Sequence, residues 1–314
     1  MNPSYTRFLG PLWFFLCILS GPLAGLSEDS ISTSPVATEF QFGSGDLLLP
    51  EFAPESEADS DLGVQMVLQP EAEYDPFTVS AFTGYYFSSN ANLSESTPIE
   101  DHVFTAGATI SYLPVLQNNL YGEATFRDQV FLYNNQSNLD FNAFDLGAGL
   151  IYVIRPLGDT SVYTRYNYAQ FSDPTIVNLG TSNYKNHSIQ AGVYKGWILA
   201  RNHFAYATWR SDVSIDGNPA SAKRDDHSAI VGYRWTPVDR LKVECFLRGA
   251  FLDYSAYGRE DWNTAAGSSL SYNFTPNIYL SAFISYTKND SNLNIDSDYK
   301  LWQPGIKLGG NWKF

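Results

Sequence analysis

Histidine beside serine is the first pairing in this chain that could support catalysis. His187 is followed by Ser188, and His227 by Ser228. A histidine that activates a serine hydroxyl must lie within hydrogen-bond distance of it. Both pairs fall in segments with the period of a β-strand, where adjacent residues point to opposite faces. We therefore expect no enzyme. The sequence also has no cysteine–histidine cluster for zinc and no glycine-rich phosphate loop, so no cofactor or metal is expected.

A second set of chemically active residues is charged and alternates with apolar residues. In "RLKVECFLRGAFLDY" (240–254), Lys242, Glu244 and Arg248 share one face, and the other face is apolar. The same alternation along the chain places eight basic side chains on that face: Arg127, Arg155, Arg165, Arg210, Arg234, Lys242, Arg248 and Lys307. The acids that it places there are Glu123, Asp145 and Glu244, with Asp212 near one end. A confined surface with this excess of positive charge attracts anions.

The elements that must position these charges are predicted to be strands. From residue 77 onward the sequence repeats with period two, and in 103–113 the side chains of Phe104, Ala106, Ala108 and Ile110 share an apolar face. Twelve segments are predicted as strands: 77–87, 103–113, 120–133, 141–155, 161–171, 186–199, 203–213, 227–238, 240–254, 262–274, 277–288 and 301–314. Each is about as long as a tilted strand that crosses a bilayer.

The joins between these segments alternate in length. Short joins such as "PLGDT" and "ARN" follow the even-numbered segments, and long polar joins such as "SSNANLSESTPIEDH" follow the odd-numbered ones. An antiparallel meander then has all its short turns at one end, as membrane β-barrels do. A soluble β-sandwich shows the same alternation along its strands. Aromatic residues near the strand ends favour the membrane barrel. Asp128 and Lys195 fall on the apolar face in this register, which indicates a bulge or a position near the interface.

The N-terminal 76 residues have a different character. Residues 1–26 contain most of the apolar run "FLGPLWFFLCILSGPLAGLS" after Arg7, which is typical of a signal peptide, although a membrane anchor or a buried helix would also contain such a run. Residues 27–76 are predicted to be a disordered acidic leader, since residues 27–75 hold twelve acids and no lysine or arginine. Residues 76–314 hold 18 basic and 21 acidic residues and are nearly neutral. We predict that they form an all-β domain, a transmembrane antiparallel up-and-down barrel of about twelve strands over 77–314.

The last ten residues, "GIKLGGNWKF", continue the alternation to the end of the chain. Ile306, Leu308, Trp312 and Phe314 fall on one face. With the signal-like run and the strand pattern, these residues resemble bacterial outer-membrane β-barrel proteins, which typically end in such a strand with a terminal phenylalanine. The resemblance implies an outer-membrane location, surrounding lipid, and recognition of these four residues by the barrel-assembly machinery. It identifies an architecture and not a particular transporter.

The expected function follows from the width of the barrel and its inner charges. A barrel of about twelve strands is wider than an eight-stranded barrel filled by side chains and narrower than a sixteen-stranded porin. Rings of arginine or lysine favour anions in pores, so a narrow diffusion channel for small anionic solutes is expected. The alternative is a non-conducting barrel, stiffened by pairing of the same residues or adhesive through its long loops. With a formal net charge of -14, the chain is expected to have no nucleic-acid partner.

Overall fold

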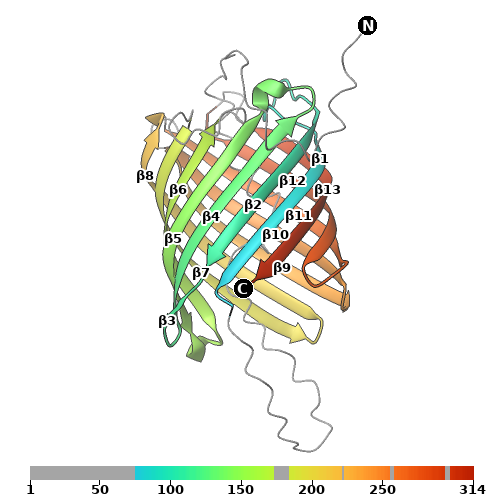
Figure 1. The fold of residues 1–314 in the computed structure, drawn as a ribbon. Helices are drawn as coiled ribbons and strands as arrows, with labels where there is room; N and C mark the ends of the chain where they lie inside the picture. The colour runs from blue at the N-terminus through green and yellow to red at the C-terminus, as the bar shows by residue number, and fades with distance from the viewer. Residues whose placement is uncertain (1–74, 173–183, 221–222, 255–257, 294–297) are drawn as a thin grey trace, which may run out of the picture.

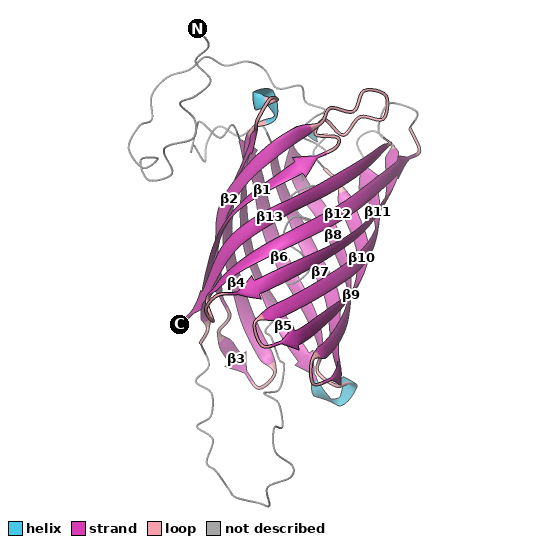
Figure 2. Cartoon of the chain, turned by 90° about the vertical axis from the view of Figure 1, so that its right-hand side faces the viewer, coloured by secondary structure: helices cyan, strands magenta, loops and turns pink. Residues whose placement is uncertain are grey.

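The computed structural model describes residues 75–172, 184–220, 223–254, 258–293 and 298–314. The predicted signal peptide and all but the last two residues of the predicted leader lie outside these ranges. The described residues form a closed antiparallel β-barrel of twelve long strands, which confirms the predicted fold class (Figures 1 and 2). No helix among the described residues is long and apolar enough to cross a membrane.

The strands follow one another around the barrel in chain order. Their bounds are β1 (Phe77–Ser88), β2 (Asp101–Tyr112), β4 (Leu120–Tyr133), β5 (Phe141–Ile154), β6 (Thr160–Ser172), β7 (Tyr184–Ala200), β8 (His203–Asn218), β9 (Asp225–Val238), β10 (Leu241–Tyr254), β11 (Arg259–Asn273), β12 (Ile278–Ser291) and β13 (Tyr299–Lys313). Three shorter elements were not predicted: β3 (Val115–Gln117), η2 (Ser137–Leu139) and η3 (Arg155–Leu157). Because consecutive long strands pair side by side, each needs only a simple reversal of the chain.

The barrel is closed by pairing between β1 and β13. The ladder runs from Thr78 opposite Lys313 to Tyr86 opposite Gly305. At the chain end, the backbone N–H groups of Phe77 and Phe314 each donate to the other's carbonyl oxygen, at 3.1 and 2.9 Å. Pro304, which has no N–H, directly precedes Gly305, where this ladder ends, and the Ser89 N–H donates to the Trp302 carbonyl oxygen at 3.1 Å beyond it. The final strand therefore pairs with the first, as the barrel interpretation predicts.

The two ends of the barrel differ, and we call them the turn end and the loop end. At the turn end, two residues join β7 to β8 and two join β9 to β10. At the loop end, side chains tie the connections to the strands. The buried Asp101 carboxylate accepts hydrogen bonds from the backbone N–H groups of Asn135 and Gln136, at 3.0 and 2.8 Å, and so fixes the start of the β4–β5 connection.

The outer face carries a band of exposed aliphatic side chains between two belts of rings. Leu150, Ile189, Val231, Leu247 and Leu280 illustrate the band, because each is at least 41% exposed. Near the loop end, rings of neighbouring strands pack together, as in Tyr286–Trp302 and Phe251–Trp262. Near the turn end, comparable contacts are Phe77–Tyr112, His203–Trp235 and Tyr272–Phe274. This distribution is opposite to that of a soluble barrel, which exposes polar side chains.

Two charged residues lie on the outer face without a bulge beside them. Asp128 accepts a hydrogen bond from the Asn142 amide at 2.9 Å, and the ladders on both sides of Asp128 are continuous. Lys195 lies near the turn end, where its ammonium group donates to the carbonyl oxygens of Leu157, at 2.7 Å, and Gly158. Both groups are thus satisfied by polar atoms near the margins of the apolar band, in the manner of interfacial side chains.

Candidate functional site

The inner face of the barrel carries most of the charges that the alternation predicts. Ten of the eleven predicted lumen residues lie on this face: Arg127, Arg165, Arg210, Arg234, Lys242, Arg248, Lys307, Glu123, Asp145 and Glu244. Asp212 also lies there, where its carboxylate accepts a hydrogen bond from Gln190 at 3.2 Å. The structure separates these residues into three groups with different surroundings.

Arg155 is the exception among the predicted lumen residues. It begins the turn η3 and not a strand, and its guanidinium donates to Asn119 Oδ1 at 2.6 Å at the exposed turn end. The physical reason is Pro156, which cannot donate a ladder hydrogen bond, so β5 ends at Ile154. Gly158 then completes the turn with a positive φ of 64°. Arg155 therefore lies in a turn and does not line the lumen, as the sequence had predicted that it would.

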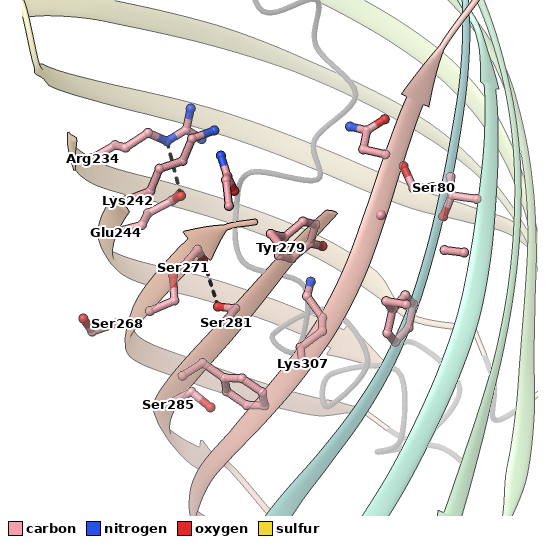
Figure 3. Close-up of a pocket in the computed structure, with 18 of the residues that line it drawn as sticks. Ser80, Arg234, Lys242, Glu244, Ser268, Ser271, Tyr279, Ser281, Ser285 and Lys307 are labelled. Carbon is pink, nitrogen blue, oxygen red and sulfur yellow. Dashed lines mark hydrogen bonds and ion pairs between the residues drawn. The ribbon is translucent and has the colours of Figure 1, made fainter. Parts of the chain in front are cut away.

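The first group lines a cavity of about 220 Å³ in the half of the lumen near the turn end (Figure 3). Lys242 is the second residue of β10, and Tyr279 is the second residue of β12, so the cavity opens close to the short turns. Its charged lining consists of Arg127, Arg234, Lys242, Lys307 and Glu244. Among the described residues, four cations and one carboxylate thus contribute to this wall.

Hydroxyl groups and aromatic rings complete the cavity. Ser271 and Ser281 hydrogen bond to one another at 2.9 Å on neighbouring strands, and Ser80 and Ser285 add further hydroxyls. The Lys307 ammonium lies 5.5 Å from the ring centre of Phe82 and 5.7 Å from that of Tyr279. Such cation–π contacts hold a lysine in place without neutralising its charge. The cavity is therefore suited to a small negatively charged molecule that also presents apolar or hydroxyl groups.

Glu244 is the one acid of the cavity wall, and it is held by two neighbours. Arg234 Nε lies 3.4 Å from Glu244 Oε2, and the Tyr206 hydroxyl donates to Oε1 at 3.0 Å. The Arg234 guanidinium also lies 5.9 Å from the ring centre of Phe204. Because one cation offsets this carboxylate, the formal charge of the cavity lining is four minus one, or +3.

The second group lies on the opposite wall and is neutralised by close pairing. Arg165 makes two parallel hydrogen bonds to Glu123, one of them from Nε to Oε2 at 2.9 Å. The Glu123 side chain is fully buried. Arg127 of the first group, which lines the cavity, lies opposite Asp145 of this wall in the β4–β5 register. A bidentate arginine–carboxylate pair is geometrically rigid, so Arg165 is part of the wall's framework.

The third group is a buried network in the loop half. Arg248 donates to Asp226 at 2.9 Å and to Asn263 at 3.1 Å, and the Arg248 side chain is 1% exposed. Asn289 donates to Asp261 at 2.9 Å, and Asp261 is also paired with Arg259. The sequence interpretation missed Asp226, Asp261 and Arg259, which it placed in loops. Arg248 and Arg259 are thus each paired with an acid here, whereas the lining of the cavity at the turn end holds four cations and one carboxylate.

Arg224 adds a charge at the rim of this network. Burial alone would lower the pKa of its guanidinium, but Tyr254, Asp226 and Tyr184 raise that pKa above its ordinary value. Its carbon Cζ lies 5.9 Å from the Tyr254 ring centre. The arginine therefore remains charged and contributes to the network at any pH where the barrel is folded.

The wall that faces this network is apolar. Tyr86, Val103, Phe131, Phe141, Ala143, Phe171 and Tyr184 form one buried cluster on the inner faces of six strands. Phe131 and Phe141 stack with ring centres 4.5 Å apart, and Phe171 packs against Tyr184. The loop half of the lumen is thus lined by aromatic rings on one side and by paired charges on the other.

The two histidines that precede serines in the sequence lie in different surroundings. His187 points outward and Ser188 inward, as the alternation predicts. His227 does contact a serine of the neighbouring strand, Ser211, with Nδ1 2.8 Å from Oγ, a pairing that sequence spacing does not reveal. Among the described residues, no carboxylate is hydrogen bonded to His227, and the strand N–H groups that might stabilise an oxyanion belong to the ladder. No cluster of metal-binding side chains occurs in the described part of the chain.

The four residues of the expected assembly signal run from the middle of β13 to Phe314, which directly follows the strand at the turn end. Ile306, Leu308 and Phe314 are exposed on the outer face, and Trp312 is half-buried beside Gly310. Lys307, between the first two, points into the lumen. The strand thus presents apolar side chains outward and its polar residues inward, in the pattern that the outer-membrane barrel resemblance implies.

Comparison with known proteins identifies the fold. No family model matches the chain, and no curated protein matches it. An outer-membrane channel from Pseudomonas putida F1 superimposes with a TM-score of 0.53 at 13% sequence identity, over 77% of this chain and 98% of the channel. The NanC porin gives 0.45 at 11% identity, over 75% and 100%, and the KdgM porin gives 0.41 at 10%, over 73% and 97%. The first similarity supports the barrel fold.

Proposed function

We propose that this protein is an outer-membrane diffusion channel, and that its turn-half cavity favours small anionic solutes. The observation that carries the proposal is the formal charge of +3 on the cavity lining. The aliphatic band between two aromatic belts supports a bilayer as the surrounding medium. In this proposal the protein's partners are outer-membrane lipid, the barrel-assembly machinery and the solute, and it is not an enzyme.

The size of the expected preference follows from Coulomb's law. At about 5 Å in a water-filled lumen, one unit charge attracts an anion by roughly 0.8 kcal/mol, or about fourfold in occupancy. Replacing one lysine by glutamate changes the local charge by two units, which corresponds to roughly 1.7 kcal/mol at that distance. Each such replacement is expected to lower anion occupancy near this position by roughly 17-fold at low salt and to raise cation occupancy by a similar factor, with smaller effects at high salt.

The experiment is a reversal-potential measurement in planar bilayers under a potassium chloride gradient. Lys307→Glu tests the cavity, because Lys307 lies on the inner face of β13. Lys300→Glu is the matched control, because it makes the same change on the outer face of the same strand. We expect a shift toward cation preference for Lys307→Glu alone. A wild-type protein that carries no current, or that prefers cations, would refute the proposal.

A second function is supported by the loop half of the lumen. The apolar cluster and the buried ion pairs there are what a non-conducting structural or adhesive barrel would require. The same bilayer recording separates the two functions, because this alternative predicts no current. If loop deletion abolishes surface binding in a protein that carries no current, the adhesive form of this alternative is supported.

A further inference from the structure

We infer that the acidic leader of this chain, residues 27–75, docks in the turn-half cavity and competes there with anionic solutes. The inference rests on the proposed function for its consequence, which is self-regulation of the channel. The docking itself depends on charge and on tethering, and each can be evaluated separately from the conduction of ions.

The leader joins the barrel at the mouth that leads to the cavity. The backbone carbonyl of Pro76 accepts a hydrogen bond from Leu113 N at 2.9 Å, and Phe77 begins β1 at the turn end. Ser80, three residues farther along β1, already lines the cavity. At about 3.3 Å per strand residue, the cavity begins roughly 10 Å from the point where the leader is attached.

The charges of the two parts are complementary. Residues 27–75 contain twelve acids and no lysine or arginine. Three of these acids, Glu71, Glu73 and Asp75, come within six residues of Phe77, and five more lie in "PEFAPESEADSD", residues 50–61. The cavity presents Arg127, Arg234, Lys242 and Lys307 against one carboxylate. Attraction between a polyanionic segment and such a confined basic surface is favourable and is screened by salt.

The tether makes weak individual attractions effective. The composition of the leader predicts a random coil, and a coil of about 15 residues has an end-to-end distance of roughly 20 Å, which covers the cavity from its attachment point. A ligand held on such a linker has an effective concentration on the order of millimolar. Free anionic solutes below that concentration therefore compete poorly with the leader at low salt, whereas salt or a multivalent anion displaces it.

Disulfide trapping in the full chain tests the docking directly. Both native cysteines are replaced by serine, and Ser56→Cys places a thiol in the acidic part of the leader without removing a charge. Its partner is Ser80→Cys, inside the cavity. The matched control is Asn277→Cys in an exposed turn at the same end, since Ser80 is paired with Asn311 and the backbone of Asn311 bonds to Asn277. Mild oxidation is followed by non-reducing gel electrophoresis and peptide mass spectrometry.

At low salt, we expect the disulfide to Ser80→Cys to form about tenfold faster than the disulfide to Asn277→Cys. Tethering alone brings the leader near both positions, so this difference requires that the leader binds in the cavity. The difference should disappear in 1 M salt, where the Debye length is about 3 Å. Lys242→Gln together with Lys307→Gln should reduce it, and Lys300→Gln on the outer face should not. Equal rates of disulfide formation at Ser80→Cys and Asn277→Cys would overturn the docking. Disulfide bonds between two protein chains, in place of bonds within one chain, would overturn it as well.

Current through the trapped protein separates this inference from the proposed function. We expect conductance to rise when a reducing agent releases the leader from Ser80→Cys. If trapping succeeds but no current flows in either state, the channel proposal fails and the docking stands. If current flows but trapping shows no preference for the cavity, the docking fails and the channel stands.

Discussion

The buried pair between Arg248 and Asp226 allows a quantitative test of the loop half of the lumen. The perturbation is Asp226→Asn, which removes one charge and leaves the side chain almost unchanged in shape. The Arg248 side chain is 1% exposed and that of Asp226 is 6% exposed, with 2.9 Å between the paired atoms. Arg248 has a second acceptor in Asn263, at 3.1 Å, but that amide carries no charge.

The expected magnitude follows from the distance and the burial. At 2.9 Å and an effective dielectric constant of about 20, the gross attraction is roughly 6 kcal/mol, most of which is offset by the desolvation of both ions. Removing one partner leaves the arginine buried without compensation, which costs about 3 kcal/mol or more. The matched control is Asp290→Asn, because Asp290 pairs with Lys288 at 2.7 Å but both side chains are 41% or more exposed. That pair is exposed to solvent and screened by it, so it contributes little.

The assay is a reversible urea titration of the barrel in detergent or lipid, followed by tryptophan fluorescence and by the gel shift between folded and boiled protein. We expect Asp226→Asn to lower the free energy of unfolding by about 3 kcal/mol, and Asp290→Asn to change it far less. The double variant Arg248→Met with Asp226→Leu should recover part of the loss, because Arg248 and Asp226 are then both uncharged and only Arg224, 14% exposed and 3.8 Å from Asp226, loses its partner. Equal effects of the two asparagine variants would refute a buried, water-excluded network.

Two further predictions concern packing and a turn. Gly232→Ala should destabilise the barrel by about 1–3 kcal/mol, because its new methyl group collides with the Tyr206 ring, whereas Gly249→Ala, with open space around it, should change the urea midpoint little. Equal midpoints for the two variants would contradict the close approach at Gly232. Arg155→Ala should change neither ion selectivity nor stability by more than about 1 kcal/mol, since it removes one exposed contact at the turn end; a changed reversal potential would return Arg155 to the lumen.

The fold could be predicted because the barrel has one apolar face along most of each strand. The predicted strand at 120–133 coincides with β4, and the other long strands end within five residues of their predicted bounds. The strand positions of Asp226 and Asp261 were not predicted, because the prediction depended on that apolar face. β9 and β11 begin two and three residues before the predicted strands, beyond the apolar band, where a strand no longer alternates in hydrophobicity and its polar residues look like a loop.

The grouping of the charges could not be predicted, because it depends on register between strands. Glu123 and Arg165 are 42 residues apart, and their pairing follows from the alignment of β4, β5 and β6. The contact between Ser211 and His227 likewise joins two strands. The alternation shows which face a side chain takes, but it does not show how far along the barrel that side chain lies. A count of inner charges therefore could not separate the basic cavity from the balanced network.

The pairing between β1 and β13, which closes the barrel, is where two neighbouring strands would separate first. Its ladder covers Thr78–Tyr86 of β1, whereas the ladder on the other side of β1 covers Phe77–Ser88. Pro304 interrupts this ladder, because a residue without an N–H cannot donate to it, and beyond Pro304 the Ser89 N–H donates to the Trp302 carbonyl oxygen at 3.1 Å. The join that closes the barrel is thus interrupted near the loop end, whereas its neighbour is continuous. A lateral opening that lets a strand or a lipid-soluble molecule pass between wall and bilayer would begin there, at the loop end of this pairing.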